Sequence, residues 1–466
     1  YEIPGDHYSI FGSPHIETLA RQIDDCLDTR TSHACQTLPD TRRHESVNIP
    51  FPPTSPTAAS PTSLPVSDLL KNLSPEFRLE HRPLSSLIEK GKIPPIDSVE
   101  LYYISDQFFQ VSGMARDTVI NGWYNNQPTI THILDTSIGC ICRLILLFTG
   151  MELYSDQPRL LELCRRALEI ASQAGATTAS LTGLLPSATN YGRAIQEAIG
   201  NGKNLPRITT GHGTTAATVV LAIRKILEAS RRDMRPESVG FLGLGSIGLA
   251  SLRLSLQCLP HPQEILLCDL YHRKKVLESI RQEVLLSYGF QGKVRLIEST
   301  GAVPEAFYES GLIVGATNVP DVLDVERLQP GTLIVDDSGP HCFRVANAIE
   351  RSLSREDILF TEGGILQSPT TIPCLRYLPH QAMEQITPGL VRLFSRFHPR
   401  RITGCVLASI LLAKVADQKP VFGLVDVQTG VENFHTLLKL KYEAADLNCE
   451  GYTLPLSLIE KVAARQ

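Results

Sequence analysis

The sequence lacks several features that would direct it to particular partners or compartments. Acidic residues outnumber basic ones, 49 Asp and Glu against 44 Lys and Arg, and the formal net charge is −5. Binding to the phosphate backbone of nucleic acids depends on an excess of basic side chains, so we expect no nucleic-acid partner. The longest apolar run, residues 144–151, is far too short to cross a bilayer, so we expect no transmembrane segment.

Cysteine is present, but its spacing matches no metal or disulfide pattern. The 11 cysteines are irregularly spaced. The closest pair, Cys140 and Cys142, has no second pair at zinc-finger spacing. The N-terminal residues show no charged segment followed by the apolar segment of a secretory leader. These absences predict a reducing, cytoplasmic location without a metal site.

The length and composition are those of a multi-domain globular protein. With 466 residues, 42% of them hydrophobic and 20% charged, the chain is long enough for about two or three domains. Five parts follow from the pattern: a turn and amphipathic helix (1–30), a linker rich in Pro, Ser and Thr (31–66), a mixed α/β part expected to bind the substrate (67–235), strands alternating with helices (236–380), and a mostly helical segment (381–466). Alternating strands and helices indicate a parallel sheet.

The strongest motif is the hexapeptide GLGSIG at residues 243–248, between a strand-like apolar run and a helical stretch. In such a turn the first glycine permits a tight bend, the second lets the backbone approach a pyrophosphate, and the third lets helix and strand pack closely. The next strand ends in Asp269, about 20 residues later, where an acid that binds the ribose is expected. A glycine-rich turn that binds nothing is the alternative. The context favours a dinucleotide site on a Rossmann-type sheet, within an α/β fold.

The sequence leaves the identity of the dinucleotide open. Asp269 would repel a 2′-phosphate and therefore favours NADH. His272, Arg273 and Lys274 follow directly, and they have the charge to bind that phosphate and so to favour NADPH. The same basic residues are equally expected at a solvated helix start. We expect NADPH, with NADH possible.

Polar loops follow two further strands of this region, at residues 315–318 and 336–341. Because the crevice of an open parallel sheet lies at the carboxyl ends of its strands, both loops should face the nicotinamide and the substrate. Asp336 and Asp337 are equally typical of turns. The residues expected to contact the dinucleotide are Gly243, Gly245, Ser246, Ile247, Gly248, Asp269, Arg273, Thr317 and Asn318.

Cys405 is a candidate nucleophile. Thr403 is a suitable N-cap for the helical stretch 406–415, so Cys405 would lie in the first helical turn. Amides at the helix N-terminus and the nearby Arg400 and Arg401 would stabilise a thiolate. A buried cysteine without a chemical role is the alternative.

His212 lies in the segment Thr-Thr-Gly-His-Gly that precedes a strong helical pattern. An imidazole at this place could donate a proton or polarise a carbonyl group at the crevice. A capping loop with a hydrogen-bonded histidine is the alternative interpretation.

Six segments taken in order resemble the long-chain acyl-[acyl-carrier-protein] reductases, which make fatty aldehydes in cyanobacteria. The resemblance covers roughly residues 150–415 and implies reduction of an acyl thioester to an aldehyde with NADPH. It also implies an acyl intermediate on the cysteine that matches Cys405. The segments are 175–183, 208–216, the glycine turn 243–248, 332–337, 362–365 and 404–410.

The chemistry implied by this resemblance is covalent. A thiolate attacks the carrier thioester, the pantetheine thiol leaves, and hydride transfer to the acyl-enzyme gives a hemithioacetal that collapses to the aldehyde. Thr210 and His212 are our candidates for donors to the oxyanion. The expected partner is an acyl carrier protein whose phosphopantetheine carries the chain. The GLGSIG turn and Asp269 differ from the pattern of these reductases, which leaves cofactor preference and chain length open.

Residues 1–30 resemble the C-terminal end of a type I thioesterase of polyketide or peptide synthases, and His7 matches its triad histidine. No G-x-S-x-G nucleophile elbow occurs in the chain, so this segment cannot hydrolyse a substrate alone. We therefore expect the reductase to be the terminal domain of a synthase with further domains upstream. The alternatives are a dehydrogenase that reduces a ketone or imine, and a non-catalytic domain that docks a carrier protein.

Overall fold

The computed structural model describes residues 70, 73–150, 152–200, 204–270, 274–299 and 301–464. All of them belong to the second of two units, Val66–Gln466. The predicted thioesterase-like segment with His7, the linker 31–66 and the basic residues His272 and Arg273 lie outside the described residues. In the described part, no helix has both the length and the apolar character needed to cross a membrane.

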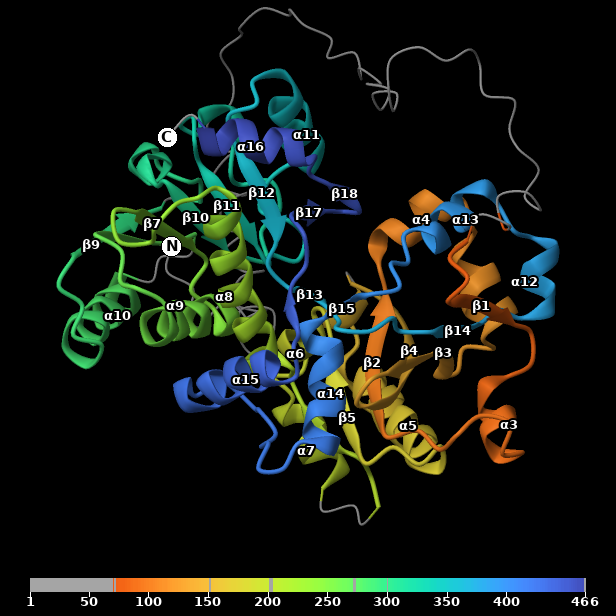
Figure 1. The fold of residues 1–466 in the computed structure, drawn as a ribbon. Helices are drawn as coiled ribbons and strands as arrows, with labels where there is room; N and C mark the ends of the chain where they lie inside the picture. Colours follow the sequence, from red (N-terminus) through yellow and green to blue (C-terminus); the bar gives the residue numbers. More distant parts are fainter. Residues whose placement is uncertain are drawn as a thin grey trace, which may run out of the picture. The chain divides into compact units, whose positions relative to one another are not determined.

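Six parallel strands form one sheet, in the order β12-β11-β10-β7-β8-β9 (Figure 1). Numbered along the chain, this is the order 3-2-1-4-5-6 of doubly wound dinucleotide-binding folds, whose topological switch point lies between β7 and β10. The prediction of an α/β fold with a Rossmann-type sheet is confirmed. The strands are β7 (Ser238–Leu242), β8 (Glu264–Asp269), β9 (Lys293–Glu298), β10 (Leu312–Gly315), β11 (Leu333–Asp336) and β12 (Leu359–Glu362).

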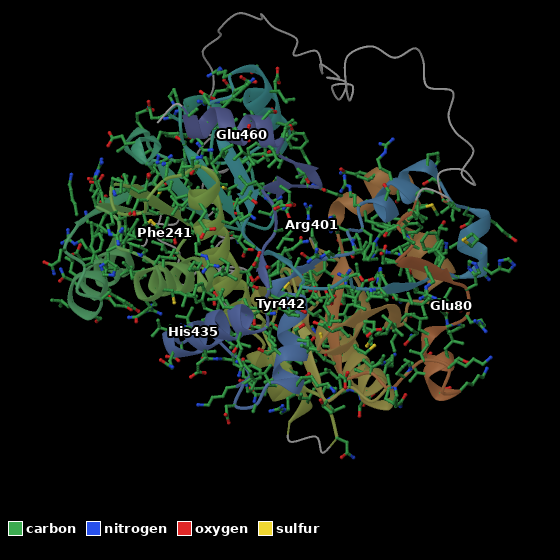
Figure 2. All side chains as sticks on the ribbon, in the orientation of Figure 1. Glu80, Phe241, Arg401, His435, Tyr442 and Glu460 are labelled. Carbon is green, nitrogen blue, oxygen red and sulfur yellow. The ribbon has the colours of Figure 1, made fainter. Side chains whose placement is uncertain are left out.

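The central strands of this sheet are almost continuously apolar because helices cover them on both faces. Phe241 on β7 is 2% exposed and lies inside this core (Figure 2). The helices and short 3-10 turns of this part are α8 (His212–Ala229), α9 (Ser246–Cys258), α10 (Lys274–Ser287), η3 (Glu305–Glu309), η4 (Val325–Arg327), α11 (Val345–Ser354) and α16 (Leu456–Ala464).

Seven strands form a second, mixed sheet in the order β1-β14-β3-β4-β2-β5-β6. Its long antiparallel hairpin, β3 with β4, is joined on one side to β14, from a distant part of the chain, and on the other to β2, the strand that precedes the hairpin. The strands are β1 (Phe77–Glu80), β2 (Ser98–Ile104), β3 (Thr129–Thr136), β4 (Gly139–Thr149), β5 (Thr178–Leu181), β6 (Arg207–Thr209) and β14 (Cys374–Tyr377).

Two helices pack on the central strands of the second sheet, α5 (Gln157–Gln173) and α14 (Gly404–Lys414). Helix α14 follows the strands of the six-stranded sheet in the sequence but packs on the seven-stranded sheet. The other helical segments are α3 (Leu84–Glu89), α4 (Asp106–Ser112), η1 (Thr118–Trp123), η2 (Glu152–Tyr154), α6 (Leu185–Ala188), α7 (Arg193–Ile199), α12 (His380–Glu384), α13 (Pro388–Ser395) and α15 (Val427–Lys439).

The sheets divide the chain differently from a simple succession of domains. Strand β14 falls within the predicted part 236–380 but pairs with β1 and β3 of the seven-stranded sheet. The segment 381–466, predicted as mostly helical, also contains short strands. Together with β13, these strands are β13 (Ile365–Gln367), β15 (Arg401–Thr403), β16 (Glu443–Ala444), β17 (Asn448–Cys449) and β18 (Tyr452–Thr453).

Candidate functional site

The turn between β7 and α9 has a backbone that only glycine allows at its first position. Gly243 has a φ of 86°, and its amide donates to the carbonyl oxygen of Cys268 at 2.9 Å. A Cβ on Gly243 would lie 2.6 Å from the carbonyl oxygen of Ala316, just after β10. A Cβ on Gly248 would collide with the carbonyl oxygen of Gly243. The turn therefore packs as the dinucleotide fingerprint requires.

The second glycine has open space instead. No described atom lies within 4 Å of the position that a Cβ on Gly245 would take, and Gly245 is the N-cap of α9. No side chain among the described residues caps this helix, which begins at the buried Ser246, with the half-buried Ile247 after it. Free helix amides beside an open glycine fit a phosphate group.

Asp269 lies beside this turn at the end of β8. Its carboxylate oxygen Oδ2 accepts a hydrogen bond from the amide of Leu244 at 3.2 Å, and the residue is 5% exposed. This is the place of the acid that binds a ribose in dinucleotide folds. Lys274, one of the basic residues considered for a 2′-phosphate, forms an ion pair with Glu298 at 2.5 Å.

The loops after β10 and β11 meet at the same edge of the sheet. The amide of Thr317 donates to the hydroxyl of Ser338 at 3.0 Å. Thr317 is buried and its Cα is 3.0 Å from the position of a Cβ on Gly243, whereas Asn318 is exposed. The structure thus brings both polar loops next to the glycine turn.

The neighbouring residues Asp336 and Asp337 have pKa values that shift in opposite directions. The buried Asp336 accepts hydrogen bonds from the ring of His341 at 2.8 Å and from the amide of Ser338 at 3.2 Å. Burial alone would raise the pKa of Asp336, but these bonds and the His341 charge lower it on balance. Burial raises the pKa of Asp337 well above its ordinary value, and the charges of Asp336 and Glu362 add to the effect. Asp336 therefore holds the turn, while the surroundings of Asp337 favour the protonated form of its carboxyl group.

Cys405 lies directly against the loop that carries Thr210 and His212. A Cβ on Gly211 would be 2.9 Å from the Cα of Cys405 and 3.1 Å from its Cβ. Cys405 lies in the first turn of α14 with Thr403 as N-cap, as the sequence predicts. The hydroxyl of Thr403 is 3.3 Å from the Cys405 Sγ atom.

His212 connects the loop that lies against Cys405 to the dinucleotide turn. It is the first residue of α8, and its Nδ1 atom is 2.9 Å from the hydroxyl of Ser246, the first residue of α9. Burial lowers the pKa of His212 to about 4, so its ring is neutral at neutral pH. The hydroxyl of Thr210 accepts a 3.4 Å hydrogen bond from the amide of His212 and retains a proton that it can donate.

The thiol of Cys405 is not stabilised as a thiolate in the way the sequence predicts. Arg401 lies on β15 (Figure 2). Arg400 donates to the carbonyl oxygens of Ser368 and Pro369, and Arg401 donates to Thr453, so the role predicted for these two arginines is wrong. Both side chains are held by groups away from the thiol.

The charged groups that do act on Cys405 are Glu100 and Arg143 of the seven-stranded sheet and Asp337, which follows β11. Burial raises the pKa of the Cys405 thiol to about 11, and the carboxylate of Glu100 adds to this rise. Arg143 acts in the opposite direction. A nucleophilic role therefore requires a group that takes the thiol proton when substrate arrives.

Three potential metal ligands gather beside Asp336. The His341 Nε2 atom is 3.6 Å from the Sγ of Cys449 and 3.8 Å from a carboxylate oxygen of Glu362, and the three ligand atoms lie within 4.8 Å of one another. Asp336 accepts from the other ring nitrogen, as partners of metal-binding histidines do. No metal site was expected from the sequence, in which the three residues lie in separate segments without a ligand spacing.

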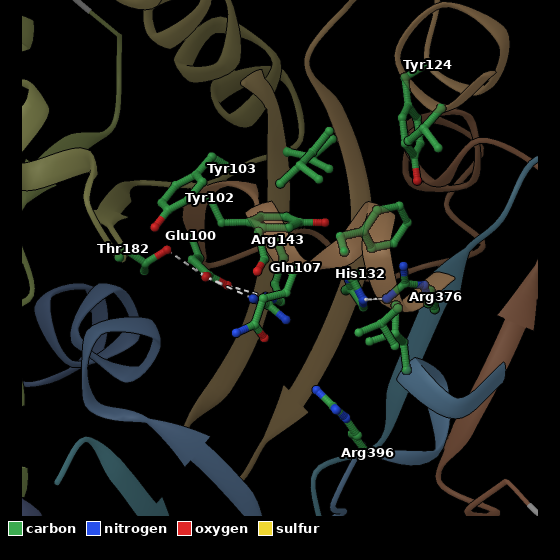
Figure 3. Close-up of a pocket in the computed structure, with 18 residues that line it drawn as sticks. Glu100, Tyr102, Tyr103, Gln107, Tyr124, His132, Arg143, Thr182, Arg376 and Arg396 are labelled. Atoms are coloured by element: carbon green, nitrogen blue, oxygen red, sulfur yellow. Dashed lines mark hydrogen bonds and ion pairs between the residues drawn. The ribbon is translucent and has the colours of Figure 1, made fainter. Parts of the chain in front are cut away.

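A cavity of about 420 Å³ lies beside the carboxyl end of β2 (Figure 3). Its lining includes Glu100, His132, Arg143 and Arg376, four polar residues on four strands. None of them was a predicted site residue. One feature of the sequence could have indicated them: a charged residue next to an apolar strand run, such as Arg143 before residues 144–151.

No known protein family and no curated protein matches the sequence. Among solved structures, the L-tryptophan dehydrogenase of Nostoc punctiforme is similar at 12% identity over 74% of this chain and 88% of that chain, with a TM-score of 0.32. The NAD+-bound 3-phosphoglycerate dehydrogenase of Entamoeba histolytica is similar at 11% identity over 76% and 100%, with a TM-score of 0.23.

A third similar structure is the Δ1-pyrroline-2-carboxylate reductase of Thermococcus litoralis in complex with NADH and L-proline. It shares 16% identity, and its TM-score is 0.22. The match covers 27% of this chain and 36% of that protein.

Proposed function

We propose that this chain is a nucleotide-dependent oxidoreductase that uses NADPH or NADH to release an acyl chain from a carrier-protein thioester as an aldehyde. The observation that carries the proposal is the loop 210–212, which contacts Cys405 through Gly211 and the first turn of α9 through His212. A cysteine and a dinucleotide turn joined in this way fit an acyl-enzyme that is reduced in place.

The residues around the glycine turn fit a dinucleotide. Gly245 and the uncapped amides of α9 would hold the pyrophosphate, and Asp269 would bind the ribose. When bound, the dinucleotide supplies a hydride. Thr317 lies at the switch point of the sheet, where a substrate meets such a cofactor.

The chain's own residues perform the acyl transfer in this proposal. Cys405 gives up its proton, and its sulfur attacks the thioester carbonyl while the pantetheine thiol leaves with a proton. The neutral ring of His212 is suited to take the cysteine proton, because no described residue bonds to its Nε2 atom. The hydroxyl of Thr210 donates to the oxygen on which negative charge develops.

Mass spectrometry of the intact protein tests the covalent step. We expect an octanoyl thioester of pantetheine, added without nucleotide, to leave one octanoyl group on the wild-type chain and on Cys140→Ala, and none on Cys405→Ala. Cys140 is a matched control because it is also half-buried. NADPH or NADH should then remove the group as octanal. A wild-type chain that binds nucleotide but never carries an acyl group would instead be a dehydrogenase acting without an acyl-enzyme.

We further propose that the thioester is presented by the phosphopantetheine of an acyl carrier protein in the same synthase. The support is the order of the six segments that resemble acyl-carrier-protein reductases, and the placement of their cysteine against the loop 210–212. An acylated carrier protein should therefore be a better substrate than the pantetheine thioester alone.

A further inference from the structure

A row of polar side chains crosses the seven-stranded sheet and lines the cavity. Glu100 on β2 pairs in register with Arg143 on β4, Arg143 with His132 on β3, and His132 with Arg376 on β14. Polar groups buried in the middle of a sheet cost free energy unless they are paired or serve a ligand. All four of these residues line the cavity (Figure 3).

The end of the row near Cys405 is electrically neutral. Arg143 donates from Nε and Nη2 to the two carboxylate oxygens of Glu100, the second at 3.1 Å. The hydroxyl of Thr182 donates to the same carboxylate at 2.9 Å. Glu100 is the one carboxylate among the described residues of the lining, and it is fully engaged by these bonds.

At the other end of the row, Arg376 contacts neutral groups. Its Nη1 atom is 2.7 Å from His132 Nε2, its guanidinium lies 4.6 Å from the centre of the Phe394 ring, and its buried Nε has no hydrogen-bond partner among the described residues. Burial, and then the charges of Arg376 and Arg143, lower the pKa of His132 well below its ordinary value. His132 therefore accepts from Arg376 and donates from Nδ1 to Thr131.

A second cation lies near this end of the cavity. Arg396 follows α13, and Figure 3 shows its guanidinium extending from the helix toward the other lining residues. No carboxylate of the described residues lies within ion-pair distance of Arg376 or Arg396. Among the described side chains, the lining thus holds two cations without acidic partners, beside apolar residues such as Val111 and Leu393. Such a site favours an anion.

We propose that the cavity binds a carboxylate at the far end of the acyl chain, so that the substrate is an acyl thioester with a second, ionised acid group. Arginine binds carboxylates with two parallel hydrogen bonds, and Arg376 has an unused buried donor. This inference rests on the proposed function, which places the thioester at Cys405.

The phosphate of the pantetheine arm is another source of the same oxyanion chemistry. Calorimetry on the full chain with Cys405→Ala, without nucleotide, separates the two through three probes: suberyl-pantetheine, octanoyl-pantetheine and octanoyl-phosphopantetheine. We expect suberyl-pantetheine to bind roughly tenfold tighter than octanoyl-pantetheine. A gain from the phosphate with no gain from the suberyl carboxylate would overturn the proposal in favour of the arm. Equal binding of all three probes would overturn the anion site itself.

Substitutions locate the effect. Arg376→Met and Arg396→Met should each bring the affinity for suberyl-pantetheine close to that for octanoyl-pantetheine. Arg392→Met is the matched control, because Arg392 is exposed on the same helix as Phe394 and does not line the cavity. Arg396 is exposed, so its variant answers the question even if Arg376→Met does not fold. A suberyl preference that survives Arg396→Met and a folded Arg376→Met would refute the assignment.

Failure of the anion site and failure of the reductase proposal give different results. A preference for the suberyl probe that the arginine variants remove, on a wild-type chain that never forms an acyl adduct, would retain the anion site and reject the acyl-enzyme. An acyl adduct on Cys405 without any suberyl preference would do the reverse.

Discussion

The two large sheets differ in where they place charged side chains. In the six-stranded sheet, β7, β10 and β11 carry no charge before their last residue, and the polar groups lie in the loops at the carboxyl ends. In the seven-stranded sheet a charged row crosses the interior through Glu100, Arg143 and Arg376. A sheet of the first kind is a rigid support for chemistry in its loops. A sheet of the second kind contributes its own strands to a binding site.

Breaking the charged row should have the largest effect on stability. Arg143→Met leaves the carboxylate of Glu100, whose side chain is 2% exposed, without its cation. We expect a loss of roughly 3–5 kcal/mol in the free energy of unfolding. Urea unfolding measures it, and adding Glu100→Gln should restore much of the loss.

The control for this prediction is an exposed ion pair on the same sheet. Arg82→Met breaks the pair with Glu80, in which the arginine side chain is 62% exposed, and should cost far less than Arg143→Met because solvent screens the exposed pair. Equal losses of unfolding free energy for the two variants would mean that the buried pair contributes no more to stability than an exposed pair. The contrast between the two sheets would then fail.

The six-stranded sheet should be sensitive at its turn. Gly243→Ala places a methyl group 2.6 Å from the Ala316 carbonyl oxygen at a positive φ, and we expect a loss of roughly 2–4 kcal/mol. Gly245→Ala meets nothing within 4 Å and should unfold like the wild type. Its nucleotide affinity, measured by fluorescence titration, should nevertheless fall, because the methyl group would occupy the approach to the pyrophosphate. Full affinity in a folded Gly245→Ala variant would argue against a dinucleotide in this turn.

The pH dependence of stability compares one buried histidine from each region. The pKa of His212 is about 4 in the folded chain and 6.5 ordinarily, so between these values the unfolded chain binds a proton that the folded chain does not. Stability should therefore be complete above about pH 6.5 and fall by roughly 2–3 kcal/mol as the pH drops to about 4. His132 on the seven-stranded sheet shifts in the same direction and should add to this fall.

Single variants separate the two contributions. His212→Gln and His132→Gln should each make unfolding free energy less dependent on pH in this window. If neither buried histidine variant changes the slope, the neutral state assigned to both rings is wrong.

The sequence by itself determined the parts of this protein that depend on neighbouring residues. The strand, the glycine turn and the helix at residues 238–258 form one local unit, because chain geometry and steric limits at Gly243 and Gly248 act over a few residues. Cys405 in a first helical turn followed from the N-cap at Thr403 in the same way.

Only the tertiary structure decided which distant segments meet. The four residues of β14 carry no signal for the sheet they join, and their pairing with β1 and β3 is what places Arg376 in the charged row. The charges acting on Cys405 likewise come from Glu100, Asp337 and Arg143, and not from its neighbours Arg400 and Arg401. Electrostatic interactions and burial depend on distance in space, and spacing along the chain does not determine that distance.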